Sequence, residues 1–353
     1  MHVVILTQVL DRQDAVLGFF HGWCDHFGRH LERLTVLAQR VGKVELPSNV
    51  TVVSLGKDQG GGRGTMLKRL TQKLVDLREA DRPDAIWAHM VPKLVLCAAP
   101  VALPRGIPIY LWYTHSQVDW SLRAAVPFVR KVFTASAESF RLPLREEKLV
   151  ITGHGIDCHH FGLGTGARPI DALVVGRIAP SKGQDEIIKA LAQLKPVPRT
   201  ELVGDILLAK DEKFRDRLLA LIRMNPHLTP KMTMRGAVPW PDIPSVMRRA
   251  RVLVDASRTG SIDKVVLEAM ASGTLPLTCN EAFAPLFGEL AGRLTYVRSH
   301  SGELAHKLTA LLSLSPAEHA ELGARVRGLV LEHHDLAALV PRLVAEMRRQ
   351  EEP

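Results

Sequence analysis

Charged side chains in the second half of the chain follow short apolar runs, at points where chemistry could occur. Arg177 and Lys182 lie in the stretch VGRIAPSKG, ahead of a helical pattern. Two cations beside the start of a helix form a site for phosphate groups. The alternative is an ordinary strand-to-helix loop with exposed basic residues, because the P-loop pattern GxxxxGK[ST] is absent.

A carboxylate inside an apolar run marks a second position. Glu268 lies in VVLEAMASG, which predicts a helix ended by Gly273. Lys264 and Glu268 form an i,i+4 pair on this helix. Gly260 and Ser261 precede the helix, where backbone N–H groups can face an anion. A surface ion pair on an ordinary helix is the alternative.

The helix start and two further strand ends add weaker signals. Asp263 lies near the start of the helix, where a carboxylate is favoured. Gly204 lies in the run LVGD, and Val238 ends RGAV. A glycine after a strand lets a ligand approach the backbone closely. Plain turn chemistry is the alternative for both glycine-containing stretches.

Polar side chains also follow apolar runs in the first half. His115 ends IPIYLWYTH, where a histidine can donate a hydrogen bond or move a proton. His89 follows AIWA as a weaker case. Gln8 ends the first apolar run, and Asp11 and Asp14 come soon after it. The two aspartates either bind an acceptor or cap the following helix, and the sequence does not separate these roles.

The elements that must position these residues alternate between strand and helix patterns. Several apolar runs are continuous, which is typical of parallel strands covered on both faces. The alternation predicts an α/β protein with two Rossmann-like, doubly wound domains. The predicted strands are 3–8, 34–39, 51–56, 85–89, 107–115, 132–136, 149–153, 172–178, 199–205, 231–238, 251–257, 275–280 and 294–299.

A glycine-rich stretch at 154–169 marks the crossing between the domains. We predict an N-terminal domain at 1–157 and a C-terminal domain at 158–335. An amphipathic helix at about 336–353, with Pro341 as a point of interruption, is expected to pack back on the first domain. Ligands of such sheets bind at the carboxyl ends of the strands, which predicts a site in a cleft between the domains.

Composition limits the class of protein. The 353 residues are 46% hydrophobic and 24% charged, as in soluble globular proteins. The absence of an apolar run of about 18 residues and of a basic leader predicts a cytoplasmic protein. Four cysteines without CxxC spacing argue against a zinc site and a disulfide framework. A net charge of +9 favours an anionic partner, with a merely basic surface as the alternative.

Taken together, the motifs resemble glycosyltransferase family 4, a family of retaining enzymes. VVGRIAPSKG, LVGD, RGAV and VVLEAMASGTLPL follow one another in the order and spacing of that family, after the crossing segment GHGIDCHHF. The resemblance covers nearly all of the second half and the first half only loosely. It implies the GT-B fold, in which two Rossmann-like domains face a cleft.

The resemblance also implies roles. Arg177 and Lys182 would neutralise the donor diphosphate, Glu268 would bind the ribose hydroxyls, and His115 would hold the donor sugar near its anomeric carbon. The backbone around Val238 would contact the base. The full donor set is Arg177, Lys182, Gly204, Val238, Gly260, Ser261, Asp263, Lys264 and Glu268, with His115, Arg177 and Lys182 as catalytic residues. The acceptor-side candidates are Gln8, Asp11, Asp14 and His89.

The implied reaction moves a sugar from a UDP- or GDP-sugar to an acceptor hydroxyl with retention, without a metal or other cofactor. The acceptor would be a glycan, a lipid-linked group or a small molecule. One departure is clear: the family has an acid eight residues before the equivalent of Glu268, and Gly260 stands there. The alternatives are a catalytically impaired nucleotide-sugar-binding subunit and a GT-B-like epimerase.

The segment 63–79 predicts a basic amphipathic helix. Its apolar stripe comprises Met66, Leu67, Leu70, Leu74 and Leu77, and its other face carries Lys68, Arg69 and Lys73. Such a helix binds an anionic membrane surface, which would place the protein on the inner face of a membrane. A packed helix with a solvated basic face is the alternative. Nucleic acid is disfavoured as a partner, because the chain has three tyrosines and lacks basic–aromatic interleaving.

Overall fold

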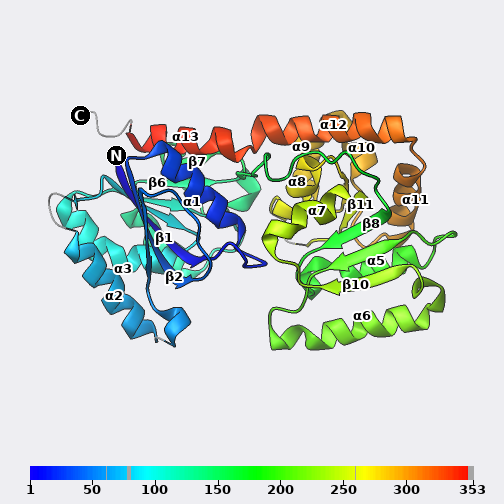
Figure 1. Cartoon of the computed structure of the whole chain (residues 1–353), viewed down its shortest axis with the longest axis horizontal. Coiled ribbons are helices and arrows are strands. Elements are labelled where there is room, and N and C mark those ends of the chain that lie inside the picture. The colour runs from blue at the N-terminus through cyan, green and yellow to red at the C-terminus, as the bar shows by residue number, and fades with distance from the viewer. Residues whose placement is uncertain (61, 78–80, 259, 349–353) are drawn as a thin grey trace. The chain divides into compact units, whose positions relative to one another are not determined.

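The computed structural model describes residues 1–60, 62–77, 81–258 and 260–348. The chain divides into two compact units (Figure 1). One contains Met1–Gly155 together with Leu336–Pro353, and the other contains Ile156–Asp335. The predicted domains were 1–157 and 158–335, with the last helix returning to the first.

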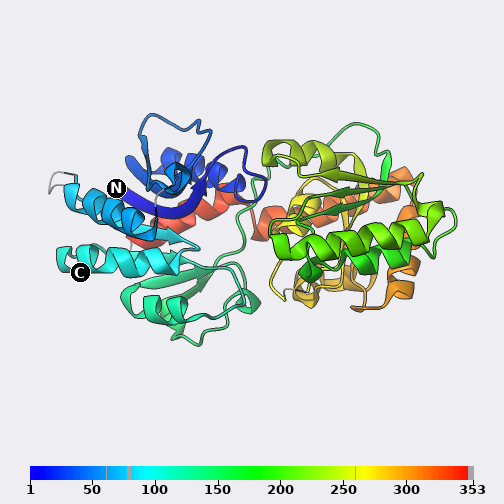
Figure 2. The same ribbon diagram turned by 90° about the horizontal axis from the view of Figure 1, so that it is seen from below.

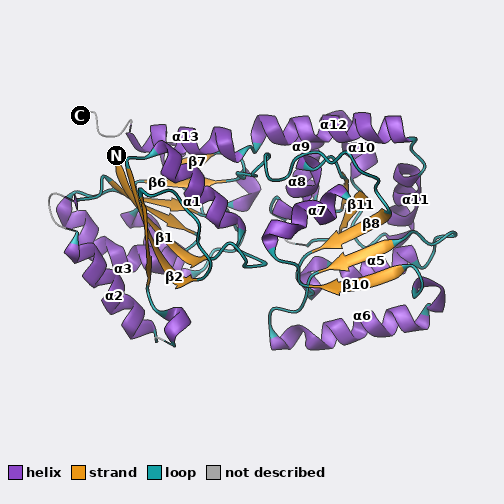
Figure 3. Ribbon diagram, in the orientation of Figure 1, coloured by secondary structure: helices purple, strands orange, loops and turns teal. Residues whose placement is uncertain are grey.

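The first unit contains a seven-stranded sheet in the order β3-β2-β1-β4-β5-β6-β7 (Figure 3). All six pairings are parallel. All five residues of β4 are buried, as expected of a strand covered on both faces. The strands are β1 (His2–Leu10), β2 (Arg33–Val41), β3 (Val50–Ser54), β4 (Ala85–His89), β5 (Ile109–Trp112), β6 (Lys131–Thr134) and β7 (Leu149–Ile151).

Helices cover both faces of this sheet. Val4 and Leu6 of β1 point into a core shared with α2 (Arg63–Asp76), α3 (Pro92–Ala102) and α4 (Trp120–Ala125). Val3 and Ile5 point to the opposite core, shared with α1 (Phe19–His30) and α13 (Leu336–Arg348). Figure 1 shows α1 and α13 on one side of the sheet and α2 and α3 on the other.

The last helix differs from its predicted form in one respect. α13 continues through Pro341 to Arg348, so the proline does not interrupt it. Pro341 is half-buried, and its neighbours Leu339, Val340 and Leu343 are buried in the first unit's core. Residues 349–353 of the predicted helix lie outside the described residues.

The second unit contains a five-stranded sheet in the order β10-β9-β8-β11-β12, with parallel pairings throughout. Its strands are β8 (Ile170–Val175), β9 (Thr200–Val203), β10 (Met232–Gly236), β11 (Ala250–Asp255) and β12 (Leu275–Thr278). Its helices are α5 (Gln184–Leu191), α6 (Glu212–Met224), α7 (Ile243–Arg248), α8 (Lys264–Ala271), α9 (Ala284–Phe287), α10 (Ala291–Leu294), α11 (Ser301–Leu312) and α12 (Pro316–His333). Helix α6 packs against α5 (Figure 2).

One strand prediction was wrong, and another strand is shorter than predicted. The segment 294–299 is not a strand: α10 ends at Leu294, and Thr295 forms only an isolated bridge with Thr278. The N–H of Thr295 donates to Ala291 and its carbonyl accepts from Lys307, so the ladder cannot continue. The segment 107–115 contains only the short strand β5, which leaves His115 three residues past the strand end.

Candidate functional site

Glycines let the carboxyl ends of the second sheet lie close together. β8 ends at Val175, and Gly176 and Gly204 follow β8 and β9 with φ of +145° and +140°. A Cβ on Gly204 would lie 1.9 Å from the carbonyl oxygen of Gly176. The backbone at this edge therefore has no space for a side chain at Gly204.

The turn that carries Lys182 is held against the end of β11. Gly183 adopts a φ of +60°, and a Cβ there would lie 2.6 Å from the Ala256 carbonyl. The N–H of Arg258 donates to the Ser181 carbonyl at 2.9 Å. These contacts bring the strand-to-helix turn 180–182 beside the loop that follows β11.

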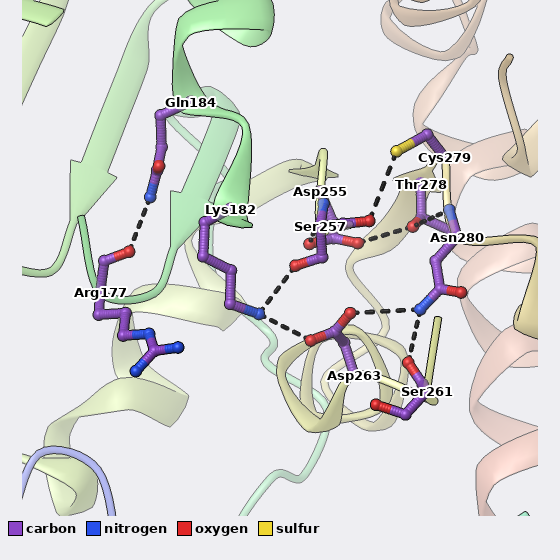
Figure 4. Close-up of polar contacts among 10 residues, drawn as sticks. All are labelled: Arg177, Lys182, Gln184, Asp255, Ser257, Ser261, Asp263, Thr278, Cys279 and Asn280. Carbon is purple, nitrogen blue, oxygen red and sulfur yellow. Dashed lines mark hydrogen bonds and ion pairs between the residues drawn. The ribbon is translucent and has the colours of Figure 1, made fainter. Parts of the chain in front are cut away.

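The side chain of Lys182 bonds two residues of the segment that follows β11 (Figure 4). Its Nζ donates to Ser257 Oγ at 2.8 Å and to Asp263 Oδ1 at 2.7 Å. The Lys182 side chain is 18% exposed. Burial lowers the pKa of Lys182, but the carboxylates of Asp263 and Asp255 outweigh burial and hold the pKa above its ordinary value. Lys182 is therefore a charged ammonium group at the edge of the sheet.

Asp263 is fixed from its other side by β12. Its Oδ2 accepts from Asn280 Nδ2 at 3.2 Å, and the same amide donates to the Ser261 carbonyl at 2.6 Å. Asp263 is the residue before α8, but its side chain makes no capping bond to that helix. The carboxylate that was expected to interact with the start of the helix thus points toward Lys182.

A second carboxylate, Asp255, lies beneath this pair. Its Oδ2 accepts from Thr278 Oγ1 at 2.7 Å, and its Oδ1 accepts from the N–H of Ser257 at 3.3 Å. Burial, followed by the negative charge of Asp263, raises the pKa of Asp255. Asp255 therefore supports the loop from below, while Asp263 provides the carboxylate at the site.

Arg177 presents its guanidinium to solvent. Its side chain is exposed, and among the residues the structure describes it donates no hydrogen bond. Its backbone carbonyl accepts from Gln184 Nε2 at 2.9 Å, which fixes the start of α5 (Figure 4). An exposed guanidinium and a half-buried ammonium group, both in the segment that follows β8, are groups that can bind an anion.

Glu268 is buried at 7% exposure on α8. Its Oε1 lies 3.5 Å from Lys264 Nζ and accepts from Trp240 Nε1 at 3.4 Å. Burial raises the pKa of Glu268, and Lys264 and Trp240 oppose the shift. Burial likewise lowers the pKa of Lys264 to about 8, although Glu268 and Asp157 oppose it. The predicted i,i+4 pair is present, with Glu268 buried and Lys264 half-buried rather than both on the surface.

The environment of Glu268 was not predicted from the sequence. Trp240 follows β10 by four residues and stacks on His160, with ring centroids 4.3 Å apart. Val238 lies two residues before Trp240 and is half-buried. The run AVPW could have indicated an aromatic side chain after a strand end, at the position proposed for the base.

Helix α12 packs against α8. Arg327 donates to the carbonyl of Ala271 at the C-terminal end of α8, and also to those of Phe161 and Cys158. A cation at this end favours the helix dipole. Gly260, at the loop before α8, has a φ of +69°, which is the left-handed region that favours glycine.

The first unit has its own pocket, of about 280 Å³. Gln8 and His115, separated by most of the first sheet's sequence, both line it. Met90, which also lines this pocket, has a φ of +58°, and its carbonyl accepts from Gln8 Nε2 at 3.4 Å. His115 is exposed, and its Nδ1 accepts from the N–H of Gln117 at 2.9 Å. The other lining residues are Gln39, Val91, Pro92, Lys93, Tyr113, Gln117, Asp119 and Ser121.

Three predicted acceptor-side residues do not line this pocket. His89 is buried, stacks on Phe20 at 3.8 Å between centroids and bonds Thr7. Asp11 accepts from the backbone of Gln13 and Lys43, and Asp14 accepts from that of Val16 and Leu17 and pairs with Arg40. Both aspartates thus stabilise the loop before α1, and neither caps that helix, which starts after Gly18 without a side-chain cap.

The predicted apolar stripe of α2 is mostly a packing surface. Leu70 and Leu74 are buried, and Met66 and Leu77 pack against the same core, whereas Leu67 is 46% exposed. Lys68 and Lys73 are exposed, and residues 78–79 of the segment lie outside the described residues. In the part of the chain that is described, every helix is too short or too polar to cross a bilayer.

Another cavity, of about 730 Å³, lies at the opposite, amino-terminal edge of the second sheet. Arg168, Arg251 and His319 line it, and all three bond backbone carbonyls or neutral hydroxyls, while Arg251 also pairs with Asp171 at 3.9 Å. Their polar atoms brace the loops before β8 and after α11. This cavity is separate from the strand ends that carry Lys182 and Glu268.

The comparison with protein families matches the second unit, and the comparison with solved structures matches both units. Residues 157–326 match the family Glycosyl transferases group 1. The match lies within the second unit and contains Arg177, Lys182, Asp263 and Glu268. Membership of glycosyltransferase family 4 stays a prediction. No curated protein matches the chain significantly.

Solved structures match the whole chain in fold. Anabaena HepE in complex with UDP-glucose is 18% identical, with a TM-score of 0.75, and the match covers 99% of this chain and 100% of HepE. A glycosyltransferase from Rickettsia africae is 14% identical, with a TM-score of 0.76 and 99% of both chains covered. Sucrose-phosphate synthase from Thermosynechococcus elongatus is 16% identical, with a TM-score of 0.77 and 99% of both chains covered. The predicted GT-B fold, with two Rossmann-like units, is confirmed.

Proposed function

We propose that this protein is a retaining glycosyltransferase that moves a sugar from a nucleotide-diphosphate sugar to an acceptor hydroxyl. The observation that carries the proposal is the charged edge of the second sheet, where Lys182 and Arg177 flank the start of α5. The match of residues 157–326 to group 1 glycosyl transferases supports it.

In this proposal the donor diphosphate binds Lys182 and Arg177. Lys182 has a raised pKa and remains charged, and the exposed guanidinium of Arg177 suits a phosphate that arrives from solvent. Glu268 accepts hydrogen bonds from the ribose hydroxyls while Lys264 and Trp240 hold its carboxylate. The backbone around Val238 contacts the base, and Gly204 lets the ends of β8 and β9 pack closely beneath the diphosphate.

The proposed reaction keeps the anomeric configuration. The bond between the anomeric carbon and the diphosphate oxygen breaks, and a bond to the acceptor oxygen forms on the same face of the sugar. The acceptor proton passes to the departing diphosphate. Lys182 and Arg177 stabilise the charge that develops on this leaving group. His115 holds the sugar near its anomeric carbon, and the proposal needs no metal or cofactor.

UDP-sugars are the first donors to test, because HepE has been crystallised with UDP and with UDP-glucose. GDP-sugars are the second class. Gln8 and the pocket of the first unit are the proposed acceptor side, and they admit a glycan, a lipid-linked group or a small molecule. An anionic membrane surface that contacts the basic face of α2 remains a proposed partner for a lipid-linked acceptor.

A thermal-unfolding screen of UDP- and GDP-sugars tests the proposal. A true donor at 100 times its Kd stabilises the protein by about 2.7 kcal/mol. Lys182→Ala and Arg177→Ala should each weaken nucleotide binding by about tenfold to a hundredfold. Lys189→Ala, an exposed lysine on the same α5 helix, is the control. Unchanged affinity in both site variants would refute the phosphate assignment.

A second candidate is a nucleotide-sugar-binding subunit without turnover. The glycine at position 260 favours it, because the residue carries no carboxylate and has a left-handed backbone. This candidate predicts donor binding without transfer and without hydrolysis. Release of free sugar from the stabilising donor, measured by chromatography, would exclude it and leave the enzyme.

A further inference from the structure

The cation that the proposed function assigns to the diphosphate already has a carboxylate partner. Lys182 Nζ contacts Asp263 and Ser257, and an ammonium group has three N–H donors. A phosphate bound to the third donor would lie close to the Asp263 carboxylate. The negative charge of Asp263 therefore repels any anion that Lys182 binds.

Hydrogen bonds hold the carboxylate of Asp263 in its position. Its side chain is 10% exposed, and Asn280 Nδ2 ties the carboxylate to the carbonyl of Ser261. Asn280 is buried and is itself held by Thr278, whose hydroxyl accepts from its N–H. Three segments of the second unit thus fix one carboxylate beside one ammonium group (Figure 4).

The charge on the ligand decides whether this arrangement attracts or repels it. A free nucleoside diphosphate ends in a phosphate monoester, whose second proton has a pKa of about 6, so it carries nearly one more negative charge than a sugar diester at neutral pH. A sugar also brings hydroxyl donors, and a carboxylate accepts hydrogen bonds well. A carboxylate next to the terminal phosphate therefore disfavours the free diphosphate and favours the sugar nucleotide.

We propose that Asp263 discriminates the nucleotide sugar from the free nucleoside diphosphate. It weakens the hold of Lys182 on a doubly charged terminal phosphate and accepts hydrogen bonds from hydroxyls of the donor sugar. This inference rests on the proposed function, because it requires a nucleotide sugar at Lys182. Asp263 thereby supplies, three residues later, a carboxylate that the left-handed backbone of Gly260 does not carry.

Isothermal titration calorimetry with UDP, UDP-glucose, GDP and GDP-mannose tests the inference at pH 7.5. For the base that binds, Asp263→Asn should tighten the free diphosphate about tenfold relative to its sugar nucleotide, since one repulsive charge is removed. Asp263→Glu keeps the charge and should keep the wild-type ratio of the two affinities within about threefold. Thermal unfolding of each variant reports whether it is folded.

Glu281→Gln is the matched control. Glu281 is exposed and follows Asn280 directly, so the variant removes a nearby negative charge without touching the Lys182 pair. Its affinity ratio should match that of the wild type. A ratio shifted as much by Glu281→Gln as by Asp263→Asn would overturn the inference.

Other outcomes separate the inference from the function on which it rests. If Asp263→Asn weakens both ligands by the same factor, Asp263 only positions Lys182, and the discrimination is refuted while the donor site stands. An unchanged ratio refutes it in the same way. If the wild-type protein binds neither nucleotide pair, the proposed function fails, and the inference fails with it.

Discussion

The carboxyl edges of the two sheets are built differently. In the second unit, half-buried or buried charged groups are held by polar contacts, as with Lys182, Asp263 and Glu268. In the first unit, the pocket at the strand ends has a mixed lining, with the amides of Gln8, Gln39 and Gln117 beside apolar residues and the charged Lys93 and Asp119. A firmly held charged edge suits one constant ligand chemistry, whereas a pocket of mixed lining is more easily altered to suit a different ligand.

The largest expected effect tests how tightly the second edge is packed. Gly204→Ala should destabilise the protein by about 3 kcal/mol, because the new Cβ meets the Gly176 carbonyl and the backbone has a φ of +140°. Urea unfolding measures the change. Gly328→Ala, in the exposed middle of α12 with open space around it, should instead stabilise by about 0.5–1 kcal/mol. Equal effects of the two substitutions would contradict the packing argument.

The next effect separates chemistry from nucleotide binding. His115→Ala, in the first unit's pocket, should lower transfer about a hundredfold and leave UDP affinity within about twofold. Initial rates and calorimetry measure the two quantities. His306→Ala, an exposed histidine on α11, is the control and should change neither. Loss of UDP affinity in the His115 variant would show that the division between the two edges is wrong.

A smaller effect concerns the buried pair in the second unit. NMR titration of lysine side chains should find the pKa of Lys264 at about 8, below the ordinary 10.5. Glu268→Gln should lower this pKa further, by about one unit, because Glu268 raises it. Glu321→Gln, exposed on α12, should leave it unchanged.

The same pair makes stability depend on pH. Because the folded pKa of Lys264 is below the unfolded one, the unfolded chain binds this proton more tightly. Its contribution to stability therefore increases as the pH rises from about 8 to 10.5. Denaturant titrations of wild type and Lys264→Met across this range would show it, and parallel curves would count against a buried pair.

The smallest effect is expected at the open edge. Gln8→Ala should raise the KM for the acceptor about threefold to tenfold, because it removes one neutral hydrogen-bonding group from the pocket. Hydrolysis of the donor should be unaffected. Gln72→Ala, on the exposed face of α2, is the matched control. A larger loss in donor hydrolysis than in acceptor KM would place Gln8 with the donor.

The sequence was sufficient to predict the architecture and to predict which strands are followed by charged residues. Continuous apolar runs predicted parallel strands, and the wrong strand at 294–299 arose because Thr295 bonds the preceding helix instead of a neighbour. Residues that follow strands, such as Lys182 and Asp263, were identified because their local pattern is visible in the chain.

The partners of those residues could not be predicted. Lys182 and Asp263 are 81 residues apart, and the amide that fixes Asp263 comes from Asn280, on a third segment. Such contacts depend on tertiary packing, which local patterns do not encode. His89 was expected on the acceptor side because it ends a strand. It lies instead in the core, where its ring stacks on those of Phe20 and Trp87.

The path of the chain through α12 and α13 affects how the protein is made. The first unit begins at Met1, yet its core includes Leu339, Val340 and Leu343 of α13. On the ribosome, the second unit is complete in sequence before α13 emerges, while the core that α1 shares with α13 still lacks the α13 side chains. The unit that is synthesised first is therefore the unit that finishes folding last.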